Sequence, residues 1–231
     1  LPVDETLQIG VKCAGALATA HVAGIVHRDI KPENLLMSQY GEVGLTDFGI
    51  AAVSSTTTVD SVGSASMSSV YLTPRHTAPE VVEGHAADAR SDIYSLCSTL
   101  WHLLVGDAPF AGPPDEPLVA VLSRLLTEPV PPMPRPDVPA SFASLLTQGL
   151  SKDPSERPLT MAELAGRLQG VEREHHFSVT MPVVQRVSAA QHPTEGGSVA
   201  NAVASTATGA FSSGDDAGAP WWIDAFRSRQ A

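Results

Sequence analysis

The stretch that decides the fold is His27-Arg28-Asp29-Ile30-Lys31-Pro32-Glu33-Asn34, and Asp47-Phe48-Gly49 begins 13 positions after its last residue. Together the two motifs place the carboxylates of Asp29 and Asp47, the amine of Lys31 and the amide of Asn34 within a short segment. Carboxylate and amide oxygens are the ligands that Mg²⁺ prefers, and a positioned carboxylate can also accept a proton. Between the motifs, a turn at Gly41 and a short strand through Val43 and Leu45 lead the chain into Asp47. The pattern predicts that metal-binding and proton-handling side chains meet at one site.

A third motif, Ala78-Pro79-Glu80, follows these two. In order and spacing the three resemble the signature H-R-D-L-x-x-x-N, D-F-G and A-P-E of protein kinases. The chain is identified as a member of the bacterial-type (Hanks-type) serine/threonine protein kinase family, and Lys31 favours serine/threonine over tyrosine kinases. The resemblance implies transfer of the γ-phosphoryl group of ATP to serine and threonine hydroxyls of protein substrates.

The family's catalytic roles carry over to five positions. By resemblance, Asp29 accepts the proton of the substrate hydroxyl, while Asn34 and Asp47 bind the Mg²⁺ that bridges the ATP phosphates. Lys31 lies beside the transferred phosphoryl group, where it stabilises negative charge and binds the nucleotide. Thr73 is expected to bridge Asp29 and Lys31. The implied cofactors are ATP and Mg²⁺.

The segment from Gly49 to Leu72 is rich in serine and threonine and poor in bulky apolar residues, so we expect it to be a mobile activation loop. Arg28 would pair with a phosphate on this segment and order it. The candidate phosphoacceptors are Thr56, Thr57 and Thr58, with another copy of the kinase as a candidate donor. A flexible polar loop without a regulatory site is the alternative.

Structural roles are implied for a further set of residues. Phe48 and Gly49 complete the D-F-G motif. Glu80 is expected to form a partly buried ion pair with Arg157. Asp92 is expected to hold the backbone of the catalytic loop, which is the motif from His27 to Asn34, by hydrogen bonds.

The stretch Leu72 to Glu80 resembles the family's substrate-binding sequence G-T-P-x-Y-M-A-P-E but departs from it at three positions. Leu72 replaces glycine, His76 replaces tyrosine and Thr77 replaces methionine. The substrate preference therefore stays open.

No glycine-rich phosphate loop and no strand lysine can be placed in the chain, whose only lysines are Lys12, Lys31 and Lys152. We expect an α+β, mainly α-helical fold that corresponds to the large lobe of a kinase (residues 1–170), with a small β element near the catalytic loop. The small lobe would be missing, so the chain alone is expected to be inactive or very weak. An uncovered nucleotide face predicts an exposed apolar patch around Leu35, Leu36 and Phe48.

Apolar periodicity and helix signals predict five helices. A helix beginning at Asp4 as its N-cap carries His21, which we expect to be a packing residue. The Thr160-x-x-Glu163 capping box is expected to start the last helix, which would end near Leu168. The expected ranges of the others are 88–106, 117–127 and 141–150.

Residues 171–231 are expected to form a low-complexity, disordered tail that ends in the aromatic patch Trp221-Trp222, whose role is open. The net charge of −11 argues against nucleic-acid binding. Cys13 and Cys97, within helical runs, predict buried reduced thiols. With no signal peptide or membrane span in sight, a cytoplasmic protein is expected.

Two other functions fit part of the pattern. A catalytically inactive kinase-like module could recruit substrates or regulators through its peptide groove. A small-molecule phosphotransferase of related fold fits less well, because Arg28, Lys31 and Ala78-Pro79-Glu80 resemble features of kinases that act on proteins.

Overall fold

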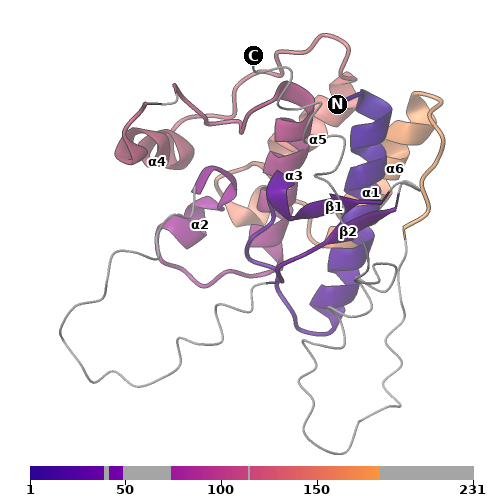
Figure 1. Cartoon of the computed structure of the whole chain (residues 1–231), viewed down its shortest axis with the longest axis horizontal. Coiled ribbons are helices and arrows are strands. Elements are labelled where there is room, and N and C mark those ends of the chain that lie inside the picture. The colour runs from indigo at the N-terminus through magenta and orange to yellow at the C-terminus, as the bar shows by residue number, and fades with distance from the viewer. Residues whose placement is uncertain (39–41, 49–73, 114, 183–231) are drawn as a thin grey trace, which may run out of the picture.

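The computed structural model describes residues 1–38, 42–48, 74–113 and 115–182. Helices make up most of these ranges, and the strands form one small sheet of two strands. Helix α1 (Val3–Val22) packs against α3 (Ala89–Val105) and α6 (Met161–Glu174), and α3 also packs against α5 (Ala140–Gly149). Figure 1 shows these four helices grouped together, with α2 (Pro79–Val82) and α4 (Leu118–Thr127) set to one side.

The apolar residues that recur at helical spacing along α1 are buried. Leu7, Val11 and Leu17 have no exposed surface. The sequence predicts Asp4 as the N-cap, but the N-cap is Pro2, two residues earlier, and it makes no side-chain capping bond. Asp4 instead lies in the first turn, where its negative charge is favourable beside the positive end of the helix dipole.

Helix α3 is the central element and is buried on almost every side. The side chain of Asp88 accepts hydrogen bonds from the backbone N–H groups of Arg90 and Ser91, and Ser91 completes a capping box. Gly106 ends the helix at φ 102°, a left-handed conformation that favours glycine. The sequence therefore marks both ends of this helix.

Strands β1 (Leu35–Met37) and β2 (Val43–Leu45) are antiparallel, with Leu35 opposite Leu45. The sheet lies against α1 (Figure 1). Leu35 and Phe48 are 5% and 8% exposed, so the expected apolar patch does not form as predicted. The reason is local: Leu35 and Leu45 join the core, and the Phe48 ring packs at 4.5 Å from the His27 ring.

Helix α6 begins after Thr160, whose hydroxyl accepts a hydrogen bond from the backbone N–H of Glu163. It continues to Glu174, beyond the expected end at Leu168, so the expected domain boundary at Gly170 falls inside the helix. The buried Glu172 carboxylate then accepts hydrogen bonds from the backbone N–H and the hydroxyl of Thr180, at 2.8 and 2.6 Å. Residues up to about 180 thus belong to the folded unit.

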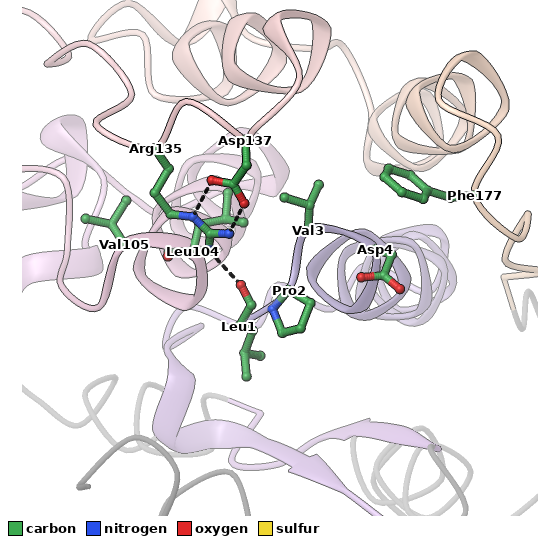
Figure 2. A pocket seen from close by; sticks show the side chains of 9 residues that line it. All are labelled: Leu1, Pro2, Val3, Asp4, Leu104, Val105, Arg135, Asp137 and Phe177. Atoms are coloured by element: carbon green, nitrogen blue, oxygen red, sulfur yellow. Dashed lines mark hydrogen bonds and ion pairs between the residues drawn. The ribbon is translucent and has the colours of Figure 1, made fainter. Parts of the chain in front are cut away.

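A pocket of about 680 Å³ opens at the start of α1 (Figure 2). Arg135 lies on its wall, where the guanidinium pairs with Asp137 and donates to the backbone oxygens of Leu1 and Leu104, at 2.7 and 2.9 Å. None of the residues expected in catalysis lines it. Of the helices in the described ranges, none combines the length and apolar character that crossing a bilayer requires.

Both cysteines are buried free thiols, in helices α1 and α3. Burial raises the pKa of Cys13 and of Cys97 to about 12. The Cys97 thiol packs so closely under Gly149 of α5 that a Cβ at that position would lie 2.2 Å from Sγ. Glycine at the end of α5 therefore permits the contact between α3 and α5.

We predict that Gly149→Ala destabilises the fold by roughly 1 to 3 kcal/mol, since an added methyl overpacks the α3–α5 contact. Gly166→Ala is the control, because a Cβ at this position of α6 would meet nothing within 4 Å. It should stabilise the fold by roughly 0.5 to 1 kcal/mol. Urea unfolding followed by circular dichroism measures both. Equal effects of the two substitutions would contradict the close contact.

Candidate active site

The Asp92 carboxylate, in the first turn of α3, holds the start of the catalytic loop. Its two oxygens accept hydrogen bonds from the backbone N–H groups of His27 (2.8 Å) and Arg28 (2.9 Å). Asp92 has no exposed surface, so these bonds offset the cost of burying its charge. Arg28 itself has φ 71°, an unusual left-handed conformation for a residue other than glycine.

His21 is a third partner of Asp92, which the sequence did not predict. Its Nε2 lies 2.8 Å from Asp92 Oδ2, so the residue expected only to fill the core makes a polar contact beneath the catalytic loop. The position of His21 near the end of α1, six residues before the loop, is the only sequence signal for such a contact. The partner of His21 cannot be predicted from this position without knowing how α1 packs against α3.

Within the loop, Asp29, Lys31 and Asn34 meet. Lys31 Nζ donates to Asp29 Oδ2 at 2.8 Å, and Asn34 Nδ2 donates to both the backbone oxygen and Oδ2 of Asp29, at 2.7 and 3.0 Å. The side chains of Asp29 and Lys31 stay about one third exposed. Lys31 and Asn34 thus hold the Asp29 carboxylate, which stays partly exposed to solvent.

The β1–β2 pair returns the chain to this group. The backbone N–H of Thr46 donates to the backbone oxygen of Asn34 at 3.0 Å, which places the next residue, Asp47, beside the catalytic loop. Asp47 has φ 59°, the second left-handed residue of the site. Such conformations concentrate at functional sites, where the surrounding structure enforces them.

His27 and Phe48 form the floor of the site. Burial lowers the pKa of His27, and the nearby carboxylates of Asp92 and Asp29 oppose that shift. The ring faces Phe48 in a tilted contact, and within the described ranges His27 Nε2 has no hydrogen-bond partner.

The residues present suit Mg²⁺ bound together with phosphate. Asp29, Asn34 and Asp47 offer oxygen donors, the set this cation prefers, but only two of the three are carboxylates. In the described part of the chain no group of three or more His, Cys, Asp or Glu side chains could hold a metal ion alone. Mg²⁺ is commonly bound by one or two carboxylates completed by water and phosphate oxygens, which matches this donor set.

Glu80 and Arg157 form a buried bidentate ion pair, with both N–O distances 2.8 Å. The Arg157 side chain is fully buried and also donates to the backbone oxygens of Ser151, Lys152 and Arg90, while Ser91 donates to Glu80. Burial acts to raise the pKa of Glu80, but the hydrogen bonds from Arg157 and Ser91 outweigh it and the pKa is lowered. The pair ties α2 to α3 and to the loop before α6.

Several expected site residues lie outside the described ranges: Gly49, the candidate phosphoacceptors Thr56, Thr57 and Thr58, and Thr73. The aromatic patch Trp221-Trp222 lies outside them as well. The described residues bring together Asp29, Lys31 and Asn34 directly, with Asp47 adjoining.

Comparison with known proteins gives one family. The model of the protein kinase domain matches residues 2–167. The chain is 39% identical over 181 residues to the serine/threonine-protein kinase PknK of Mycobacterium tuberculosis, an alignment that covers 77% of this chain and 16% of the relative. It is 41% identical over 177 residues to PkaB of Streptomyces coelicolor (73% and 40%) and 33% identical over 169 residues to PknB of Mycobacterium leprae (73% and 26%). The chain thus spans less than half the length of these curated relatives.

We predict that Arg157→Met lowers the free energy of unfolding by roughly 3 to 5 kcal/mol, because it leaves the Glu80 carboxylate buried without its partner. The lowered pKa of Glu80 means that the pair stabilises the protein above the ordinary carboxyl value of 4.5 and that this contribution is lost as the pH falls further. Urea titrations at pH 7 and pH 3.5 should therefore show a smaller difference in acid.

The matched control is Arg167→Met, which removes an exposed pair with Glu163 at 3.8 Å. It should change stability by no more than roughly 0.5 kcal/mol. An Arg157 variant no less stable than this control would contradict the structural importance of the buried pair.

Proposed function

Because the chain belongs to the protein kinase family, among relatives that are bacterial serine/threonine kinases, we propose that its protein transfers the γ-phosphoryl group of ATP to serine and threonine residues of protein substrates. The observation that carries the proposal is the hydrogen-bonded group Asp29, Lys31 and Asn34, anchored through the backbone of residues 27 and 28 to Asp92.

Asp29 is the proposed catalytic base. Its carboxylate would accept the proton of the substrate hydroxyl as the oxygen attacks the γ-phosphorus. Lys31, 2.8 Å from Asp29 Oδ2, would stabilise the negative charge on the transferred group. Thr73 is proposed to bridge the side chains of Asp29 and Lys31.

Asn34 and Asp47 are the proposed Mg²⁺ ligands. Asn34 uses Nδ2 to bind Asp29, so its amide oxygen remains for a cation. The Thr46–Asn34 backbone hydrogen bond supports the same role for Asp47, because Asp47 is the next residue along the chain. Asn34 and Asp47 would hold Mg²⁺ together with phosphate oxygens of ATP, and the cation would offset the negative charge of the phosphates. The use of ATP as co-substrate favours a cytoplasmic location.

Regulation is proposed at Arg28. Its side chain is exposed although its backbone is held by Asp92, so the guanidinium is available to a phosphate on Thr56, Thr57 or Thr58. A second copy of the kinase is a candidate source of that phosphate.

We also propose that the folded unit corresponds to the large lobe of the kinase, which the sequence predicts over residues 1–170, and that a low-complexity tail follows it. The sequence holds neither a glycine-rich phosphate loop nor a strand lysine. Phosphoryl transfer by this chain alone should therefore be absent or very weak.

We predict that Asp29→Asn lowers phosphoryl transfer by a factor of roughly 10² to 10⁴, the usual contribution of a general base. The assay follows labelled γ-phosphate from MgATP to a generic protein substrate. It compares this chain, a form extended upstream through its reading frame, and that extended form with Asp29→Asn.

The control is Glu174→Gln in the extended form, an exposed carboxylate at the end of α6. It should keep full activity. No transfer by the extended form would overturn the proposed reaction and leave the inactive binding module. Equal transfer with and without Asp29 would reject Asp29 as the catalytic base.

A further inference from the structure

The family's usual tyrosine in the substrate-binding sequence is replaced by His76, and the structure shows what the imidazole contacts. His76 lies in the 3₁₀ turn Pro74–His76 and is 9% exposed. Its Nδ1 is 2.8 Å from Ser98 Oγ, and its Nε2 is 3.2 Å from Nδ1 of His102. Ser98 and His102 are one turn apart on α3, so both ring nitrogens of His76 engage the same helix.

The two imidazole rings are stacked, with centroids 5.2 Å apart and 20° between planes. A neutral imidazole carries one N–H donor and one acceptor nitrogen. Ser98 can donate or accept, so a chain from Ser98 through His76 to His102 is satisfied in either tautomer of His76. Both polar atoms of the buried ring are therefore used, which makes the contact directional as well as apolar.

The charges around the pair are mixed. Arg75 flanks His76 on the same turn and pairs with Asp107, which follows α3, at 3.2 Å. The positive charge of Lys31, on the catalytic loop, also acts on His76, and the negative charge of Glu33, on the short helix Pro32–Asn34, acts on His102. The positive charge of Arg75 also acts on Glu116, which precedes α4.

Burial and, after it, the positive charge of protonated His102 and of Arg75 lower the pKa of His76 to about 3. Burial also lowers the pKa of His102, against the opposing effect of Asp107 and Glu33. Both rings are thus neutral at pH 7, the state in which the hydrogen-bond chain needs no buried charge.

We propose that His76 is a positioning residue for protein substrate: its hydrogen bonds to Ser98 and His102 fix the substrate-binding stretch on α3. The inference rests on the proposed kinase function. It requires hydrogen bonding by residue 76, whereas a packing role would require only its volume. Arg75, the residue before His76, donates a hydrogen bond to Asp107 and so holds the same stretch at a second point.

Two substitutions separate hydrogen bonding from volume. His76→Gln keeps one donor and one acceptor at the end of the side chain, and His76→Phe keeps a planar ring without either. In the upstream-extended form, His76→Phe should raise the KM for protein substrate about tenfold, the factor that one lost hydrogen bond supplies, with the KM for ATP unchanged. His76→Gln should restore the KM to within about threefold of wild type.

His85→Gln is the matched control, because this histidine is 70% exposed and lies just after α2. It should leave both constants unchanged. Ser98→Ala, a smaller change that removes one partner of His76, should shift the protein-substrate KM in the same direction as His76→Phe. If His76→Phe retains the wild-type KM while His76→Gln does not, residue 76 acts by volume and the proposal is overturned.

Hydrogen exchange measured by mass spectrometry tests the pair without any activity. In the full chain at pH 7, amides of residues 76–83 should exchange about tenfold faster in His76→Phe than in His76→Gln, with exchange in α1 and α6 equal in both. Equal exchange of residues 76–83 would overturn the proposal. Faster exchange together with no phosphoryl transfer by the extended form would instead keep the anchor and reject the kinase reaction.

Discussion

The buried carboxylate of Asp92 is the constraint on which the site depends. A charge without exposed surface is tolerated only where donors surround it, and here the donors are two consecutive backbone N–H groups and a histidine from another helix. Satisfying that carboxylate sets the backbone of His27 and Arg28, and with it the direction in which Asp29 leaves the loop. The buried Asp92 side chain thus orients Asp29, the proposed catalytic base, through the backbone of the two residues that precede it.

Helix α3 extends the same principle along its length. Ser91 donates to Glu80, Ser98 contacts His76, and Thr99 Oγ1 lies 3.4 Å from the backbone oxygen of Ile30. Each is a small polar side chain on an otherwise apolar, buried helix. The catalytic loop, the substrate-binding stretch and the ion pair with Arg157 therefore all contact α3, so one helix fixes their relative positions.

Sequence alone predicted the elements whose ends carry chemical signals. Asp88 and Gly106 bound α3, and Thr160 starts α6, because capping groups and left-handed glycines act locally. Contacts between distant segments were harder: His21 gave no sign of its partner on α3, and the buried state of Leu35 and Phe48 depends on how the sheet meets α1 and His27. The continuation of α6 beyond Gly170 was missed for a similar reason, since the contact between Glu172 and Thr180 forms only after the chain has turned back. Where resemblance named a partner, as for Glu80 and Arg157, the pairing could be expected before any geometry was known.

The two buried thiols have a practical consequence. With pKa values raised to about 12, the buried thiols of Cys13 and Cys97 stay protonated at pH 7, and only the thiolate reacts with alkylating reagents and peroxides. The native fold is thus chemically silent toward thiol probes. A single cysteine introduced on the surface would be the one reactive handle of the folded protein's described part, so spectroscopic labels could be attached there without removing the natural cysteines from the core.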